Sequence, residues 1–445
     1  MLVALPSMAQ DTLTIDECRE MALTYNKQMA ASAHATRSAL YTAKSYKGNF
    51  FPNIYLSGTG LYSTADGSFG IDGGYLPTFL ADATGSLAAD GGYAYFPGVD
   101  LDYDIDAVFM GGVTIEQPIY MGGKINAAYK LALIGKDIAQ KQETLTATEV
   151  IQKTDEAYAG VVKAAETRKV AEAYQALLGE LMKDVESAYR HGMKPKNDVL
   201  KVQVRLNESE LSLRKAENAL RLAKMNLCHY IGRQLTDDIN VSEEMPAVVV
   251  PSDLQTLDVS QRPEYAILEK QVDMAHQQVK LNRSEMLPQV GLSASYNYLH
   301  GIDVNDNTLL DNGNFTALLN VSIPIFHFGE RKNKVSAAKS RLLETQMEQQ
   351  DVNEQMLLEL AQAANNLDEA LLEVDIAERS LVQAEENMRV SRSQYDAGME
   401  TLSDHLEAQT LWQQAYQEKV DAAYQLYLSY VAYQKAAGTL YGGEQ

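Results

Sequence analysis

The chain has 445 residues, enough for two or three ordinary domains, and 46% of them are hydrophobic, which is typical of a folded protein. The formal net charge of −22 argues against a nucleic-acid partner, because phosphate binding requires an excess of Lys and Arg. The two cysteines, Cys18 and Cys228, form no metal-binding motif. We interpret them as small buried thiols, with a disulfide as the alternative.

Residues 1–9 resemble the end of a secretory signal peptide, with an apolar stretch followed by small residues before a cleavage site after Ala9. A basic segment is missing, so we interpret these residues as a signal-peptide remnant; a plain ragged terminus is the alternative. No Cys follows the site, which argues against an N-terminal lipid anchor. No run of 18 apolar residues occurs elsewhere, so the sequence predicts no membrane-spanning helix.

The first predicted element is a helix that begins at the capping-box pattern Thr14 to Glu17 and continues to Lys47, where Gly48 and Pro52 end it. A β-hairpin is then predicted over residues 53–117.

Within this hairpin the strand pattern covers residues 54–62 and 105–115. The insertion between them, residues 66–106, is rich in Gly, Asp and Tyr and almost free of cations, so it is expected to be a long extracellular loop. We expect that it can be shortened without loss of folding.

Two helical hairpins dominate the prediction, over residues 124–230 and 330–437. The first arm of each has almost no Pro or Gly, and 68 helical residues would reach about 100 Å. The returning arms are predicted to begin at the N-cap candidates Asp198 and Asp404. In the second hairpin, apolar residues recur every three or four positions, as in a coiled-coil seam: Leu357, Leu360, Ala364, Leu367, Leu371 and Val374. The other faces are polar, so the helix must pack edgewise and contact water.

A second β-hairpin is predicted over residues 289–323, after a helix that begins at Pro263. Each strand has about ten residues with alternating apolar and polar side chains, and a polar loop over 303–314 joins them. This length and period suit a transmembrane β-strand. A half-buried hairpin of a soluble protein has the same alternation and is the alternative.

These elements form an internal duplication with an offset of 206 residues. Gly398-Met399 corresponds to Gly192-Met193, and the register holds over about 90 residues without a gap. We therefore divide the chain into repeat 1 (10–232), an irregular connector (233–262) and repeat 2 (263–445).

We find no catalytic constellation and no phosphate-binding or metal-binding motif, so we expect neither enzymatic activity nor a cofactor or metal. Four strands are too few to close a membrane barrel, and lipid does not tolerate an open sheet edge. If the strands lie in a membrane, several chains must share one barrel.

The chain resembles the outer-membrane efflux proteins of the TolC family from Leu13 to Tyr441. The match is carried by the glycine turns above, by the ending Ala437-Gly438-Thr439-Leu440, and by the strand starts and strand-to-helix corners: Pro52, Pro118, Gly122, Gly123, Pro288, Pro324 and Gly329. It departs from the family at Asn26-Lys27, where members often have Asn-Pro, and in its long first loop.

The resemblance implies a mainly α-helical homotrimer with a shared twelve-stranded outer-membrane β-barrel, in contact with outer-membrane lipid, and a long periplasmic α-helical barrel. It implies an exit duct for tripartite efflux or type I secretion. The partners would be a periplasmic adaptor (membrane fusion protein) and an inner-membrane pump of the RND or ABC type. The alternatives are a general porin, which would need strands through most of the chain, and a periplasmic coiled-coil adaptor, which would have one helical hairpin.

The resemblance also places functional residues at the helical tips. Gly192, Met193, Gly398 and Met399 would bind the adaptor. Asp404 and Glu407, three residues apart on one helix face, would form two acidic rings at the gate; an N-cap Asp with a solvated Glu is the alternative. A tip constraint would involve Asp198, Tyr395, Glu400, Lys194 and Lys196. Because Glu400 replaces the usual Arg, we expect it to pair with one of the two lysines.

Overall fold

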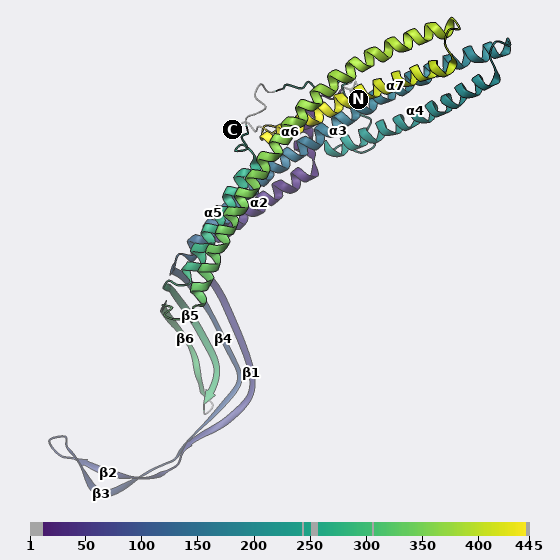
Figure 1. Ribbon diagram of the computed structural model, residues 1–445. Helices are drawn as coiled ribbons and strands as arrows, with labels where there is room; N and C mark the ends of the chain where they lie inside the picture. Colours follow the sequence, from purple (N-terminus) through teal and green to yellow (C-terminus); the bar gives the residue numbers. More distant parts are fainter. Residues whose placement is uncertain (1–11, 243, 251–256, 305–306, 442–445) are drawn as a thin grey trace, which may run out of the picture. The chain divides into compact units, whose positions relative to one another are not determined.

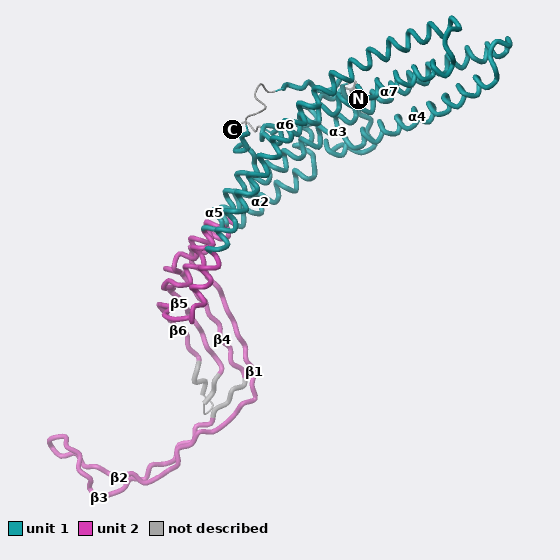
Figure 2. Tube along the Cα trace, viewed as in Figure 1, with its two compact units in different colours: residues 1–42, 132–276, 339–445 teal, residues 43–131, 277–338 magenta. Residues whose placement is uncertain are grey.

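The computed structural model describes residues 12–242, 244–250, 257–304 and 307–441. The predicted signal-peptide remnant, residues 1–9, lies outside the described residues. The chain folds into two compact units (Figure 2). Unit 1 takes residues 1–42, 132–276 and 339–445, and unit 2 takes residues 43–131 and 277–338. Each unit therefore contains segments of both repeats.

Seven helices cover most of the described residues (Figure 1). They are α1 (Ile15–Tyr25), α2 (Lys27–Gly48), α3 (Lys124–Arg190), α4 (Lys196–Tyr230), α5 (Pro263–Ser284), α6 (Glu330–Asp396) and α7 (Leu402–Ala437). The two long helices α3 and α6 have 67 residues each and begin 206 residues apart, which confirms the predicted duplication. None of the helices in the described part of the chain is long and apolar enough to cross a membrane.

The predicted single helix from Thr14 to Lys47 is wrong, because Asn26 interrupts it. Asn26 has an extended backbone, with ψ of 133°, and ends α1. Its side-chain oxygen accepts the backbone N–H of Gln28 at 2.8 Å, and its side-chain nitrogen donates to the carbonyl of Tyr230 at 2.9 Å. One buried Asn thus caps the start of α2 and ties the break to the end of α4, without the Pro that often follows it in related proteins.

The turns of the two helical hairpins have the same geometry, as the duplication requires. Gly192 and Gly398 both have φ of 73°, and the N–H groups of Met193 and Met399 bond back to Ala188 and Gln394 at 2.9 Å. This is a glycine-terminated helix end, as predicted. The predicted N-caps are wrong, since the returning helices begin two residues earlier, after Pro195 and Thr401.

The larger sheet is antiparallel, with the order β1-β4-β5-β6 (Figure 1). Its strands are β1 (Asn53–Ile71), β4 (Val99–Met121), β5 (Gln289–Val304) and β6 (Asn307–Ser322). All four are longer than predicted, and the expected loop over 303–314 is mostly strand.

The predicted first loop also contains strands. β2 (Gly74–Ala81) and β3 (Leu87–Phe96) pair with each other as a second, two-stranded sheet. Tyr75 lies opposite Tyr95 and Leu76 opposite Ala94. Aromatic and branched residues favour extended backbone even where Gly is frequent, and the loop prediction gave that preference too little weight.

The helices of unit 1 pack through several apolar clusters. Near the tips, α3, α4, α6 and α7 share one that includes Leu178, Val202, Leu381, Leu406 and Trp412. A further cluster confirms the predicted coiled-coil seam on α6, where Leu360 and Leu367 are almost fully buried.

Candidate functional site

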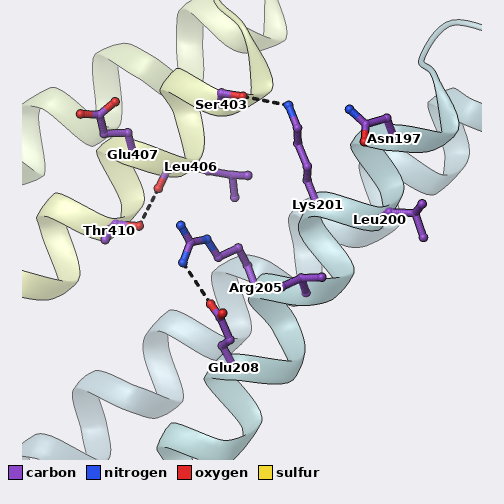
Figure 3. A pocket seen from close by; sticks show the side chains of 10 residues that line it. Asn197, Leu200, Lys201, Arg205, Glu208, Ser403, Leu406, Glu407 and Thr410 are labelled. Atoms are coloured by element: carbon purple, nitrogen blue, oxygen red, sulfur yellow. Dashed lines mark hydrogen bonds and ion pairs between the residues drawn. The ribbon is translucent and has the colours of Figure 1, made fainter.

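A groove of about 760 Å³ lies between α4 and α7, next to the turns of the helical hairpins (Figure 3). Lys201 reaches across it from α4, and its Nζ donates to Ser403 Oγ on α7 at 3.1 Å. Arg205 lies one turn further along α4 and pairs with Glu208 at 3.0 Å. The groove is lined by Asn197, Leu200, Lys201, Val204, Arg205, Glu208, Ser403, Leu406, Glu407 and Thr410.

The floor of this groove is apolar, and part of it is open to solvent. Leu200 and Val204 are each more than half exposed, although both lie one or two helical turns from the tip of a long hairpin. Exposed apolar side chains inside a polar rim are typical of a surface that binds another protein. The sequence prediction located the tips but missed this groove, because its two walls come from different repeats.

The two acids predicted for the gate are both exposed, but they have different surroundings. Glu407 lines the groove. Asp404 lies in the first turn of α7, where its carboxylate accepts the hydroxyl of Thr401 at 2.7 Å and its N–H donates to the same oxygen at 3.3 Å. Thr401 is therefore the N-cap, and Asp404 supports it from the third helical position.

Glu400 does not form the predicted ion pair with a lysine within this chain. Its Oε1 instead accepts a hydrogen bond from Ser391 Oγ on α6 at 3.0 Å, and its Oε2 is buried without a partner among the described residues. The same hydroxyl lies 3.0 Å from Nδ1 of His405, whose Nε2 lies 3.0 Å from Nε2 of Gln409. Glu400 thus joins a buried polar chain between α6 and α7.

Tyr395 lies at the centre of the predicted tip constraint. Its ring stacks on His405 at 5.1 Å between centroids, with an interplanar angle of 7°, and Lys194 lies 4.7 Å from the same ring centroid. Burial raises the pKa of Tyr395, and the charge of Asp198 raises it further. Lys194 therefore contacts Tyr395 and not Glu400, and Asp198 influences the phenol through its charge.

Ser391, His405 and Gln409 were missed by the sequence analysis, although all three are almost fully buried. A signal was present: His405 and Gln409 lie on the same helical face as Leu402 and Leu406, which belong to the apolar cluster at the tips. Polar residues in such positions need internal partners.

The larger sheet has one apolar face. Leu56 of β1 lies opposite Val113 of β4, Val113 opposite Tyr296 of β5, and Tyr296 opposite Phe315 of β6. Directly opposed residues of an antiparallel sheet share a face, so these four form a row across it. They are between 42% and 80% exposed, far more than the core of a soluble sheet allows.

The opposite face of this sheet is polar. Tyr55, Thr114, Ser295 and Thr316 form the adjacent row across the same four strands. The Tyr55 hydroxyl donates to Glu116 at 2.7 Å. Of the four strands, β1 and β6 are the outer ones, so each pairs on one side only within the described part of the chain.

Comparison with known proteins accounts for both features. The family model "Outer membrane efflux protein" matches residues 19–233 and 259–439. The outer membrane protein TolC of Vibrio cholerae is 20% identical over 310 residues, which are 68% of the chain and 70% of that protein. The alkaline protease secretion protein AprF of Pseudomonas aeruginosa is 21% identical over 348 residues, 77% of the chain and 71% of that protein.

Solved structures share the fold. The crystal structure of the outer membrane protein VceC from Vibrio cholerae matches with a TM-score of 0.74 at 16% sequence identity. The match covers 95% of this chain and 96% of VceC.

Proposed function

The chain belongs to the outer membrane efflux protein family, which acts in the outer membrane as an exit duct for efflux or secretion, and we propose that three copies of this chain build one such duct. The observation that carries the proposal is the sheet β1-β4-β5-β6, which is apolar on one face, polar on the other and open at β1 and β6. Lipid requires every backbone polar group to be paired, so β6 of one copy would pair with β1 of the next. Three copies would then close a twelve-stranded barrel.

The two faces of β5 allow a direct test with neighbouring residues. Leu292 lies opposite Leu319 on the apolar face, and Ser293 lies on the polar face opposite Glu116. We expect Leu292→Lys to lower the yield of heat-resistant trimer strongly, because a Lys facing lipid costs about 2–4 kcal/mol at the bilayer midplane. Ser293→Lys should be tolerated as a lumen-facing change.

The measurement is the amount of trimer in purified outer membranes, read from gel mobility with and without heating and from light scattering in detergent. Equal loss of trimer in both variants would contradict the assignment of the faces. A monomer in detergent for the unaltered chain would contradict the trimer itself.

We further propose that a periplasmic adaptor, coupled to an inner-membrane pump, docks at the tips and in the groove between α4 and α7. The exposed Leu200 and Val204 and the cations Lys201 and Arg205 support an apolar contact bordered by charge. The tip glycines set the shape of this surface: a side chain at Gly192 or Gly398 would have open space but a strained backbone, since φ is 73° at both.

We therefore expect Gly192→Val and Gly398→Val to abolish adaptor crosslinking and export while the trimer still forms. Gly135→Val is the matched control, because Gly135 also has open space around it but lies inside α3 with ordinary helical φ. Export of a fluorescent dye and crosslinking from a photoreactive residue at position 200 are the measurements. Unchanged crosslinking in both tip variants would count against the docking surface.

The acids Asp404 and Glu407 are proposed to form the gate rings, one set from each copy. Carboxylate rings attract cations, so Asp404→Asn combined with Glu407→Gln should reduce cation selectivity and relieve block by multivalent cations. Asn keeps an oxygen that can accept the Thr401 hydroxyl, so the helix cap is preserved. Glu386→Gln, an exposed acid on α6 that pairs with Arg389, is the control in planar-bilayer recordings. Wild-type selectivity and block in the double variant would place the gate elsewhere.

A further inference from the structure

The buried polar chain at the second tip has a single consistent arrangement of protons. The carboxylate of Glu400 can only accept, so Ser391 donates its one hydroxyl proton to Glu400 at 3.0 Å. The oxygen of Ser391 must then accept from His405, which places a proton on Nδ1. The remaining ring nitrogen, Nε2, has a free lone pair and accepts from the amide nitrogen of Gln409 at 3.0 Å. His405 is therefore neutral in this arrangement.

Protonation of His405 would break this sequence of bonds at one end. A proton on Nε2 would point at the amide nitrogen of Gln409, which is itself a donor. The contact could be restored only by rotation of the amide, and Gln409 is 1% exposed inside the packed tip. Its Oε1 is already buried without a partner among the described residues. An added charge and a donor facing a donor are both costly at such a site.

We propose that Ser391, His405 and Gln409 form a tip latch that holds α7 to α6 while His405 is neutral and releases it when the imidazole is protonated. The latch is continuous with the turn at Gly398, because Glu400 belongs to that turn. The ring of Tyr395, which stacks on His405, connects it to Lys194 on the neighbouring tip.

The charged groups around His405 determine the direction of the response. From α6, Arg392 and Asp396 act on it, and Arg392 also pairs with Asp184 of α3 at 3.1 Å. From the turn, Glu400 favours the protonated ring. Beyond the Tyr395 ring lie Lys194 and Asp198.

Burial is the largest effect on His405 and lowers its pKa, the charge of Arg392 lowers it further, and Glu400 and Asp396 oppose both. A histidine with a lowered pKa in the folded state supports that state above its unfolded pKa of about 6.5 and loses the contribution as the pH falls. Acid therefore favours release.

The consequence for transport rests on the proposed function: if the tips form the periplasmic end of a duct, release of the latch favours an open end in acid. The closing experiment separates the two ideas. Hydrogen exchange of the full-length protein in detergent reports on the latch whether or not the chain conducts ions. Conductance in planar bilayers reports on the duct.

Amide exchange in residues 399–409, corrected for intrinsic rates, should rise about tenfold between pH 7.5 and pH 5, the factor for loss of one buried hydrogen bond. His405→Gln should remove this pH dependence. Gln409→Glu should keep the tip protected in acid, because a carboxylate can accept the proton on Nε2. His191→Gln is the matched control: His191 is an exposed histidine on the other tip that contacts only Ser187 among the hydrogen-bond partners found in the described residues, and its variant should behave like the wild type.

A wild-type tip with no exchange step, or a step that persists in His405→Gln, would overturn the latch. A step that persists in Gln409→Glu would overturn the donor conflict as its cause. An exchange step accompanied by conductance that does not change with pH would overturn its role in opening the duct and leave the proposed duct itself to its own tests.

Discussion

Replacing Arg19 with Met should lower the free energy of unfolding of the helical unit by about 3–5 kcal/mol, because it leaves a buried carboxylate without its partner. The side chain of Asp155 is fully buried, and Arg19 binds it with two nitrogens, Nε at 2.8 Å and Nη2 at 2.6 Å. This pair joins α1 to α3. Isosteric Met keeps most of the apolar stem of Arg19, so the loss reports mainly on the unpaired charge.

The pH dependence distinguishes an unpaired charge from lost packing. Burial already raises the pKa of Asp155, and removal of Arg19 should raise it further. A carboxyl with a raised folded pKa is stabilised in the folded state as the pH falls, because the neutral form carries no desolvation cost. The deficit of Arg19→Met should therefore be largest at neutral pH and shrink toward pH 5 in thermal unfolding followed by circular dichroism.

Two controls complete this test. Arg19→Met with Asp155→Leu removes both charges and should recover most of the lost stability. Arg379→Met breaks an exposed pair with Asp375, also 2.8 Å long, and should have little effect. A double variant as unstable as the single one would show that packing, and not the buried charge, explains the loss.

The sequence was most informative where structure is local or repeated. The long helices follow from the absence of Pro and Gly, and the offset of 206 residues predicts the matching turns at Gly192 and Gly398. The helix break at Asn26 was missed because its cause is a bond to Tyr230, which is 204 residues away. Local propensity contains no trace of such a contact.

The tip shows the same limit at the level of single side chains. The replacement of Arg by Glu400 indicates that the usual constraint is absent, and an ion pair with a nearby lysine was the natural expectation. The structure turns Glu400 toward Ser391, because the buried His405 and Ser391 need a final acceptor. Which residues are buried at a tip depends on the packing of four helices, and a linear pattern does not determine it.

The corner between β4 and α3 gives the second large effect, and adjacent glycines provide the comparison. Gly122 and Gly123 both have positive φ, 63° and 84°. A Cβ on Gly122 would overlap the backbone oxygen of Ser284 and lie 2.9 Å from Cβ of Leu287, whereas a Cβ on Gly123 would meet nothing within 4 Å. Ser284 ends α5 and Leu287 precedes β5, so the corner of one repeat packs directly on the turn of the other within unit 2.

The second repeat shows that contact, and not φ alone, requires glycine at position 122. The residue 206 positions later is Phe328, which also has positive φ, 44°, and is 93% exposed. A side chain is therefore accepted in this backbone conformation where no neighbour approaches. We expect Gly123→Ala to cost only the backbone strain, about 1–2 kcal/mol, and to leave trimer yield near the wild-type level.

Gly122→Ala should instead reduce heat-resistant trimer by an order of magnitude or more, because the obstructing atom belongs to the backbone and cannot move aside as a flexible side chain can. Substitution of Leu287 by Ala would leave the overlap with Ser284 in place, so it should not rescue Gly122→Ala. Trimer yields from outer membranes, with total chain measured in parallel, give the comparison. Equal yields for Gly122→Ala and Gly123→Ala would mean that α5 can shift away from the corner, and that the packing between the two repeats is looser than these contacts require.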